Sequence, residues 1–301
     1  MTVVLDCDNT LGIPDAEVDD GLALLYLLSR DEISLAGVTT TFGNGSAADA
    51  LRQTEWLCEM VGKTELAVVP GQEKRGAPPR SSARFLVEHA REHAGELVIV
   101  ATGPLGNLAA AGALDPQFFS RLAGIVIMGG IRQELRFPAG PVDELNFSAD
   151  PQAAYTVLTA ECPVVLMDAH VCLQAWLDAS DIAARSRWPS WLTRSLSGWL
   201  AAFRNMTGEA RFFLWDLLPA VYVIQPALFH GPVVKLTSSA ADLERGVVRD
   251  TLIDEHHCSG TMFAHPALSG KGVLFRPSTI ADPRSFKDHL LASWDALLGT
   301  K

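Results

Sequence analysis

The sequence predicts an α/β fold in which a mostly parallel sheet is covered by helices on both faces. Short apolar runs alternate with helical stretches through the first half of the chain. The runs lack polar alternation, as in Leu97–Ala101 (LVIVA), which indicates strands buried on both faces. Glycine or polar residues close each run, so the predicted strands have defined carboxyl ends.

The predicted elements follow one another in a regular order. In the first half we expect strands at 3–5, 33–41, 66–69, 97–101, 125–128 and 164–167, with helices at 21–28, 46–61, 82–93 and from 105 onward. The second half is more helical, with expected helices at 180–205 and 215–224 and a β-rich tail at 231–236, 247–253 and 273–275. We see no linker or internal repeat, so we expect one domain spanning residues 1–301, whose helical second half caps the rim of the sheet.

Size and charge restrict the possible partners. The chain has 301 residues, 48% of them hydrophobic, which is ample for a large core. Its net charge of −11 argues against nucleic acid and anionic membranes as partners, since both require a basic surface. The first residues run straight into a strand, without a basic or cleavage-like segment, and we expect a cytoplasmic protein. The five cysteines show no CxxC spacing and are expected to be free thiols.

The first twenty residues contain the most informative feature of the chain. Asp6 and Asp8 end the first predicted strand, and the pair Asp19-Asp20 opens the next helix. Strand ends and helix starts meet at one rim of an open α/β sheet, where ligands bind. Crowded carboxylates repel one another unless a positive charge lies between them, and a hard divalent cation is the simplest candidate. Each aspartate alone could be a helix cap, but four together indicate a site.

The segment Asp6-Cys7-Asp8-Asn9-Thr10 permits a second interpretation. It fits the DxDxT signature of haloacid-dehalogenase phosphatases, in which the first Asp is the nucleophile and the second the acid. That family also needs a lysine and a later acidic pair for magnesium. None of the six lysines follows a convincing strand end ahead of such a pair. The match therefore stands alone and is the less favoured interpretation.

A longer series of motifs resembles the inosine–uridine nucleoside hydrolase family. The motifs occur in the family's order between residues 3 and 229. They are Asp6-x-Asp8 with Asp19-Asp20, Gly37-Val38-Thr39-Thr40 with Gly43-Asn44, Ala101 to Leu108 (ATGPLGNL), Met128-Gly129-Gly130, Glu144-x-Asn146 with Asp150-Pro151, and Asp216 with Gln225-Pro226-Ala227-Leu228-Phe229.

The resemblance implies a fold, an activity and a set of site residues. The fold would be the nucleoside-hydrolase α/β domain, and the activity would be calcium-dependent hydrolysis of a ribonucleoside to ribose and free base. Asp8, Asp20, Asp216 and the main-chain carbonyl of Ile127 would bind Ca²⁺. Asp8 would also take the proton from the attacking water that the calcium binds. Asp19, Asn44, Glu144 and Asn146 would hold the ribose hydroxyls. A homodimer or homotetramer is also implied.

The chain departs from the family pattern in the turn after the first strand. The family usually has a compact Asp-Pro-Gly-x-Asp-Asp turn, whereas here residues 9–18 enlarge it. Asp15 has the family's spacing to Asp19-Asp20, but Asp8 has the strand-end position. We favour Asp8 as the middle acid because the strand fixes the direction of its side chain. The family's Gly-Asn before Glu-x-Asn is also replaced, by Phe137-Pro138.

The second departure concerns the leaving group. Many members carry His-Asp where this chain has Trp215-Asp216, and that histidine is thought to protonate the leaving base. Tryptophan has no transferable proton, although it can stack on a purine. A member with altered specificity, or one that only binds a nucleoside or sugar, is therefore a second hypothesis.

Other histidines and aromatic residues are weaker candidates for the site. His170 is expected to be packed or solvated, and His256-His257 to lie on the surface. Core packing is favoured over base stacking for the aromatic residues of the helical region. These are Trp176, Trp188, Trp191, Trp199 and Phe203.

Overall fold

A nine-stranded sheet forms the centre of the protein. The computed structural model describes residues 1–77, 81–255, 263 and 266–299. The strand order is β13-β12-β14-β8-β5-β4-β1-β2-β3, and pairing is parallel from β14 through β3, while β12 is antiparallel to both of its neighbours. The strands are β1 (Thr2–Cys7), β2 (Ser34–Thr40), β3 (Val68–Val69), β4 (Leu97–Ala101), β5 (Gly124–Met128), β8 (Val164–Met167), β12 (Val233–Leu236), β13 (Asp250–Asp254) and β14 (Val273–Phe275). The predicted mostly parallel α/β sheet is confirmed.

Both faces of the sheet are buried, as the unbroken apolar strands predict. In β1, the side chains of Val3 and Leu5 enter one hydrophobic cluster, and that of Val4 enters a second. In β4, Val98 and Ile99 are divided between the two clusters in the same way. Successive strand residues point to opposite faces, so each cluster lies on its own side of the sheet.

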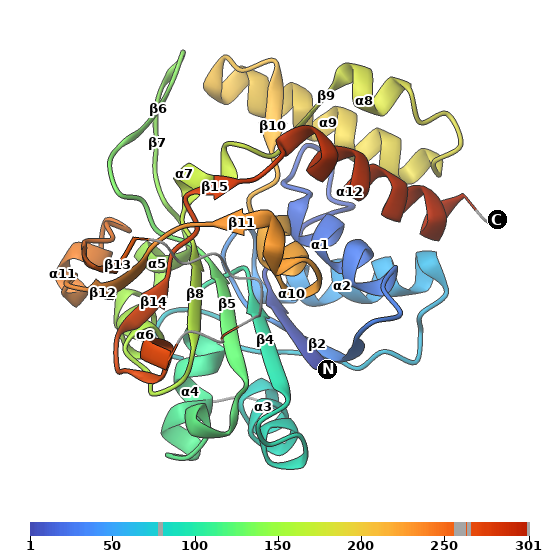
Figure 1. The fold of residues 1–301 in the computed structure, drawn as a ribbon. Helices are drawn as coiled ribbons and strands as arrows, with labels where there is room; N and C mark the ends of the chain where they lie inside the picture. Colours follow the sequence, from blue (N-terminus) through green and yellow to red (C-terminus); the bar gives the residue numbers. More distant parts are fainter. Residues whose placement is uncertain (78–80, 256–262, 264–265, 300–301) are drawn as a thin grey trace.

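Helices cover both clusters. Figure 1 shows α3 and α4 on one side of the sheet and α1, α10 and α12 on the other. The α-helices are α1 (Asp19–Leu28), α2 (Ala47–Val61), α3 (Ser81–Glu92), α4 (Gly106–Leu114), α5 (Asn146–Ala149), α6 (Pro151–Leu158), α7 (Ala169–Cys172), α8 (Ala179–Ala183), α9 (Ser190–Thr207), α10 (Leu217–Ile224), α11 (Ala240–Leu243) and α12 (Pro283–Leu298). Short 3₁₀ turns occupy Phe119–Arg121, Pro226–Leu228 and Pro266–Ser269.

Local sequence signals set several helix ends. Ser46 begins α2 by accepting a hydrogen bond on its Oγ from the Asp49 N–H at 3.1 Å. Gly62 ends the same helix with φ +74°, a left-handed conformation that favours glycine. Asp150 begins α6 in the same manner, with Pro151 at the first helical position.

The second half contains elements that the sequence pattern did not predict. Residues 180–205 were expected to form one helix, but they form parts of α8 and α9 with a break between them. A hairpin of β6 (Leu135–Phe137) and β7 (Gly140–Val142) and a pair of β9 (Trp176–Asp178) and β10 (Arg211–Phe213) also appear, with β11 (Phe229–His230) paired to β15 (Thr279–Ile280). The long α12 was not anticipated.

The parallel strands bring chemically important residues to one rim. The carboxyl ends of β1, β4, β5 and β8 lie at the same edge because these strands are parallel neighbours. None of the described helices is both long and apolar enough to cross a membrane. Four of the five cysteines are buried free thiols, as expected, and Cys258 lies outside the described residues.

Candidate active site

Asp8 lies directly after β1 and is completely buried. Its Oδ2 accepts the backbone N–H of Asn44 at 2.5 Å. Two glycines leave room for the carboxylate: a Cβ on Gly43 would lie 2.0 Å from Asp8 Oδ2, and one on Gly103 would lie 2.6 Å from Oδ1. Backbone from the loops after β2 and β4 therefore encloses Asp8 and fixes its direction.

Asp19 and Asp20 are the first two residues of α1, and both are buried. Thr102, just after β4, donates its hydroxyl to Asp20 Oδ1 at 2.7 Å. The N–H of Asp216, which precedes α10, donates to Asp19 Oδ2 at 3.1 Å. Segments far apart in the sequence therefore converge on these two carboxylates.

The structure adds a carboxylate that sequence reasoning missed. Oxygens of Glu17, Asp19 and Asp216 lie within 4.8 Å of one another. Asp15, the other acid of the enlarged turn, is exposed, has φ +61° and lies against Gly198 of α9. Asp15 has the family's spacing to Asp19-Asp20. In the folded turn, however, Glu17 and not Asp15 contributes an oxygen to the cluster.

The electrostatics of the cluster call for a positive charge. Burial raises the pKa of Asp8 to about 7 and that of Asp19 to about 6. Burial, and then the neighbouring carboxylates, raise the pKa of Asp20 and Asp216 well above the ordinary value. Asp8, Asp19, Asp20 and Asp216 each have one buried oxygen without a hydrogen-bond partner. Over the described part of the chain, no ion pair reaches any of the four.

The donor set fits a hard divalent cation. Ions of this kind prefer several carboxylate and carbonyl oxygens, and the four unpartnered oxygens are of that type. After burial, the charge on Asp8 does most to raise the pKa of Asp20, and the charges on Asp19 and Asp20 do most to raise that of Asp216. Charges on the expected ligands Asp8 and Asp20 therefore both raise the pKa of the third expected ligand, Asp216. The three acids whose oxygens lie within 4.8 Å of one another are nevertheless Glu17, Asp19 and Asp216. Ile127 lies in β5, one residue before the strand ends.

Three of the four residues expected to hold ribose, Asn44, Glu144 and Asn146, line a cavity of about 280 Å³ that reaches the acidic cluster at Glu17 and Asp216. Its wall includes Asn44, Glu144, Asn146, Asp216 and Glu17. The Nδ2 group of Asn146 donates to the carbonyl oxygens of Thr102 and Met128, at 2.8 and 3.1 Å. Its side chain is therefore held by the ends of β4 and β5.

Glu144 is held by the backbone around it. Its Oε1 accepts the N–H groups of Gly130 and Phe147, and its Oε2 accepts that of Ser148. These bonds tie the start of α5 to the end of β5. Asp19, the remaining expected ribose ligand, is not among the described residues that line the cavity, but it accepts the N–H of Asp216, which is.

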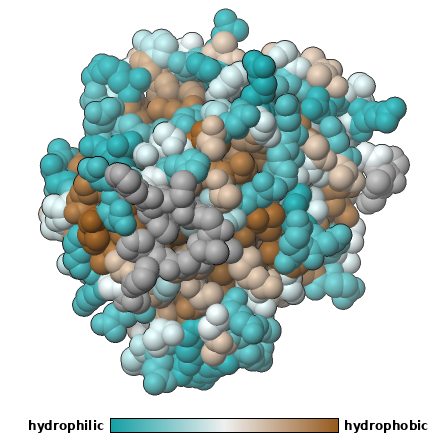
Figure 2. Space-filling view, in the orientation of Figure 1, coloured by the Kyte–Doolittle hydropathy of each residue, from teal (hydrophilic) through white to brown (hydrophobic). Residues whose placement is uncertain are grey.

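One wall of the cavity is aromatic and apolar. Trp215, Trp199 and Phe203 line it, together with Met206 and the hairpin residues Leu135 and Val142. Figure 2 shows hydrophobic surface gathered near the top of the molecule, where Figure 1 shows the β6–β7 hairpin beside β10. Trp199 and Phe203 were expected only to pack in the core; they do pack there, but they also line the cavity.

No histidine is among the described residues that line this cavity. His170 instead lies beside buried Asp168, with 3.8 Å between its Nδ1 and Asp168 Oδ1, and burial lowers its pKa. Arg132 and Arg276 also approach Asp168, so this histidine belongs to a packed polar group, as expected. His256 and His257 lie outside the described residues.

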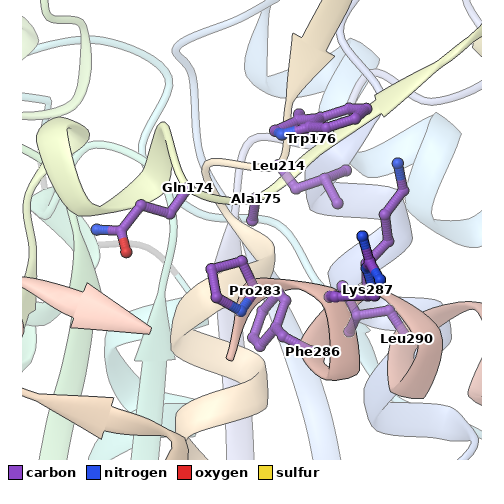
Figure 3. A pocket seen from close by; sticks show the side chains of 9 residues that line it. Gln174, Ala175, Trp176, Leu214, Pro283, Phe286, Lys287 and Leu290 are labelled. Carbon is purple, nitrogen blue, oxygen red and sulfur yellow. The ribbon is translucent and has the colours of Figure 1, made fainter. Parts of the chain in front are cut away.

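A second cavity, of about 320 Å³, is lined by none of the clustered acids. Figure 3 shows the side chains that line it. Gln174, Trp176, Phe286 and Lys287 are among the residues that line it. Two cations lie close to the Trp176 ring, with Lys287 Nζ 3.6 Å and Arg211 Cζ 4.9 Å from its centroid. No carboxylate is among its lining residues in the described chain, so we do not assign the site to it.

The buried carboxylates predict how stability depends on pH in the presence of a chelator. Between the ordinary pKa of 3.8 and the raised value of about 7, folded Asp8 keeps a proton that the unfolded chain has lost. The free energy of unfolding should therefore fall as pH rises through this window. We expect a lower melting temperature at pH 7.5 than at pH 5, and a smaller difference in Asp8→Asn. Asp49→Asn, a control at a carboxylate whose pKa is lowered, should leave the difference unchanged. A melting temperature that rises from pH 5 to pH 7.5 would contradict this account.

Comparison with known proteins identifies the family. The sequence pattern of the inosine-uridine preferring nucleoside hydrolases matches residues 3–268. Uridine nucleosidase 1 of Arabidopsis thaliana is 30% identical over 247 residues, which cover 71% of this chain and 73% of the relative. A pyrimidine-specific ribonucleoside hydrolase of Escherichia coli is 26% identical over 60% of this chain and 64% of its own length.

A solved structure agrees with these sequence matches in fold. The purine-preferring ribonucleoside hydrolase of Gardnerella vaginalis superposes with a TM-score of 0.83 over the full length of both chains, at 20% identity. At this identity the likeness concerns the fold, while the sequence pattern covers most of the chain. The chain therefore belongs to the inosine-uridine preferring nucleoside hydrolase family, a metal-dependent family of glycosidases that hydrolyse the N-glycosidic bond of ribonucleosides.

Proposed function

We propose that this protein is a calcium-dependent nucleoside hydrolase that releases ribose and a free base, and that residues 1–301 form one domain for this purpose. The observation that carries the proposal is that four buried aspartates each keep an oxygen without a hydrogen-bond partner, and that one of them, Asp216, lines the 280 Å³ cavity. Asp8, Asp20, Asp216 and the carbonyl of Ile127 would hold the ion. When bound, calcium would supply a positive charge that lowers the pKa of a water molecule and orients it.

Asp8 has the features of the general base. Its Oδ2 is occupied by the Asn44 N–H, whereas its Oδ1 is buried and has no hydrogen-bond partner. Oδ1 is therefore the atom that would accept a proton from the attacking water. A side chain at Gly43 or Gly103 would collide with one of the two oxygens, so glycine at both positions keeps the space that the carboxylate occupies. A positioned base of this kind accelerates a reaction by about 10²–10⁴-fold.

The ribose would bind between the carboxylates and the side chains above them. Asn44, Glu144 and Asn146 line the cavity, and Asp19 accepts the N–H of Asp216, which also lines it; these four residues would hold the sugar hydroxyls. The glycosidic bond breaks through a transition state with oxocarbenium character, whose positive charge is favoured beside the buried carboxylates. The same residues thus orient the sugar and stabilise the charge that develops on it.

The aromatic wall would hold the base. Trp215 is 9% exposed, and its ring packs against that of Phe213, with 5.3 Å between the ring centroids. Together with Trp199 and Phe203 it offers flat, apolar surface to a planar ring. Relatives with uridine, pyrimidine and purine in their names match this chain, so the base is assigned here from the wall alone. We propose a purine or another extended planar leaving group.

One assay tests the activity directly. Purified protein is incubated with a panel of ribonucleosides, and reducing sugar is measured with and without a calcium chelator. Release of sugar that the chelator abolishes and added calcium restores supports the proposal. Binding of nucleosides without sugar release would instead identify a non-catalytic member, and phosphate release from sugar phosphates would support the phosphatase hypothesis.

The choice of Asp8 as the base gives a matched pair of variants. Asp8→Asn should lower sugar release by at least about 100-fold, because the amide cannot accept the proton. Asp216→Ala should abolish it by removing an ion ligand. Asp15→Asn, on the exposed part of the turn, should retain normal turnover. Near-normal turnover in Asp8→Asn together with an inactive Asp15→Asn would show that Asp15 is the base.

Trp215 predicts an unusual dependence on the leaving group. With no histidine among the described lining residues, departure of a poor leaving group is slow, whereas a p-nitrophenolate needs little protonation. The unmodified protein should therefore hydrolyse p-nitrophenyl riboside much faster than inosine. Trp215→His should raise turnover of inosine more than that of the activated riboside. The control Trp176→His, outside this cavity, should change neither turnover. Equal turnover of both substrates by the unmodified protein would reveal an acid elsewhere.

A further inference from the structure

The enlarged turn between β1 and α1 has a defined conformation that fixes the backbone of Glu17. The hydroxyl of Thr10 donates to the carbonyl oxygen of Glu17 at 2.8 Å. Asn9 accepts the Leu11 N–H on its Oδ1 at 2.9 Å and donates from its Nδ2 to Thr54 Oγ1 of α2 at 3.3 Å. These bonds attach the turn to itself and to the neighbouring helix. The position of Glu17 is therefore a built feature of this chain.

The side chain of Glu17 reaches the acidic cluster from the cavity side. One of its oxygens lies within 4.8 Å of oxygens of Asp19 and Asp216. Calcium–oxygen distances are about 2.3–2.6 Å, so an ion bound to Asp216 could also contact the Glu17 oxygen. Asp19 Oδ1 and Asp216 Oδ1 are buried and have no hydrogen-bond partner. Glu17 and Asp216 both line the cavity, which leaves this part of the cluster accessible from it.

We propose that Glu17 is an additional carboxylate ligand of the cation, supplied by the enlarged turn of residues 9–18. This inference rests on the proposed function, because it concerns the same cation site. Affinity for calcium increases with the number of charged ligands, so the added carboxylate strengthens binding of the ion. Asp15, two residues earlier, is exposed, lies beside Gly198 of α9 and is not part of the acidic cluster.

Calcium binding to the substrate-free protein tests the proposal without reference to activity. Calcium alone is titrated calorimetrically into chelator-treated protein, and the calcium-induced rise in melting temperature is recorded alongside. Glu17→Gln should weaken calcium binding by at least about tenfold and reduce the rise in melting temperature. Glu17→Asp, which keeps the charge on a shorter side chain, should bind with intermediate affinity. The matched control Asp15→Asn should bind calcium as the unmodified protein does.

The outcomes separate this proposal from the proposed function. Unchanged or tighter calcium binding in both Glu17→Gln and Glu17→Asp, with binding lost in Asp216→Asn, would overturn the role of Glu17 and leave the cation site intact. Failure of the unmodified protein to bind calcium, or unchanged binding in Asp216→Asn, would contradict the calcium site itself. Circular dichroism shows whether Glu17→Gln folds. If it does not, the calcium affinity of Glu17→Asp is the test, and an affinity equal to that of the unmodified protein overturns the proposal.

Discussion

Repulsion among buried carboxylates is the constraint on which the functional part of this structure depends. Asp8, Asp19, Asp20 and Asp216 are all buried at one rim of the sheet, and each keeps an oxygen without a partner. Burying unpaired charge costs several kcal/mol per group unless a counter-charge or a proton is supplied. The surrounding fold supplies hydrogen bonds from Asn44 and Thr102, but the described chain brings no cationic side chain. A bound cation resolves the conflict.

Two chemically different groups of residues line the cavity beside the cluster. Glu17, Asn44, Glu144, Asn146 and Asp216 are polar, whereas Trp199, Phe203 and Trp215 are aromatic. This division matches a polar sugar joined to a flat base. In the proposed binding mode, energy gained on the aromatic residues would position the sugar near Asp8, so both groups of residues would orient the bond to be broken. None of the described residues that line the cavity is a histidine, so the rate of hydrolysis would depend strongly on how readily the leaving group departs without a proton.

Sequence reasoning predicted the sheet and the convergence of the aspartates, because both follow from apolar runs and strand ends. The strands Leu97–Ala101, Val164–Met167 and Val273–Phe275 were predicted to the residue. The β6–β7 hairpin was not predicted because its strands have only three residues each. The place of Trp199 in the cavity lining was not predicted because its helical spacing is also that of a core residue. Glu17 could not be distinguished from Asp15 by pattern, since the hydrogen bonds of the turn decide which acid faces inward.

A crystal structure determined with calcium shows directly whether the buried aspartates form a calcium site. We expect one ion per chain, identified by its anomalous signal, with oxygens of Asp8, Asp20 and Asp216 at about 2.3–2.6 Å. Binding of the ion would draw these carboxylates together beside the carbonyl of Ile127. A well-ordered structure from calcium-saturated crystals that shows no ion at the rim, with the carboxylates of Asp20 and Asp216 more than about 8 Å apart, would contradict it, since that span exceeds what one calcium ion can bridge.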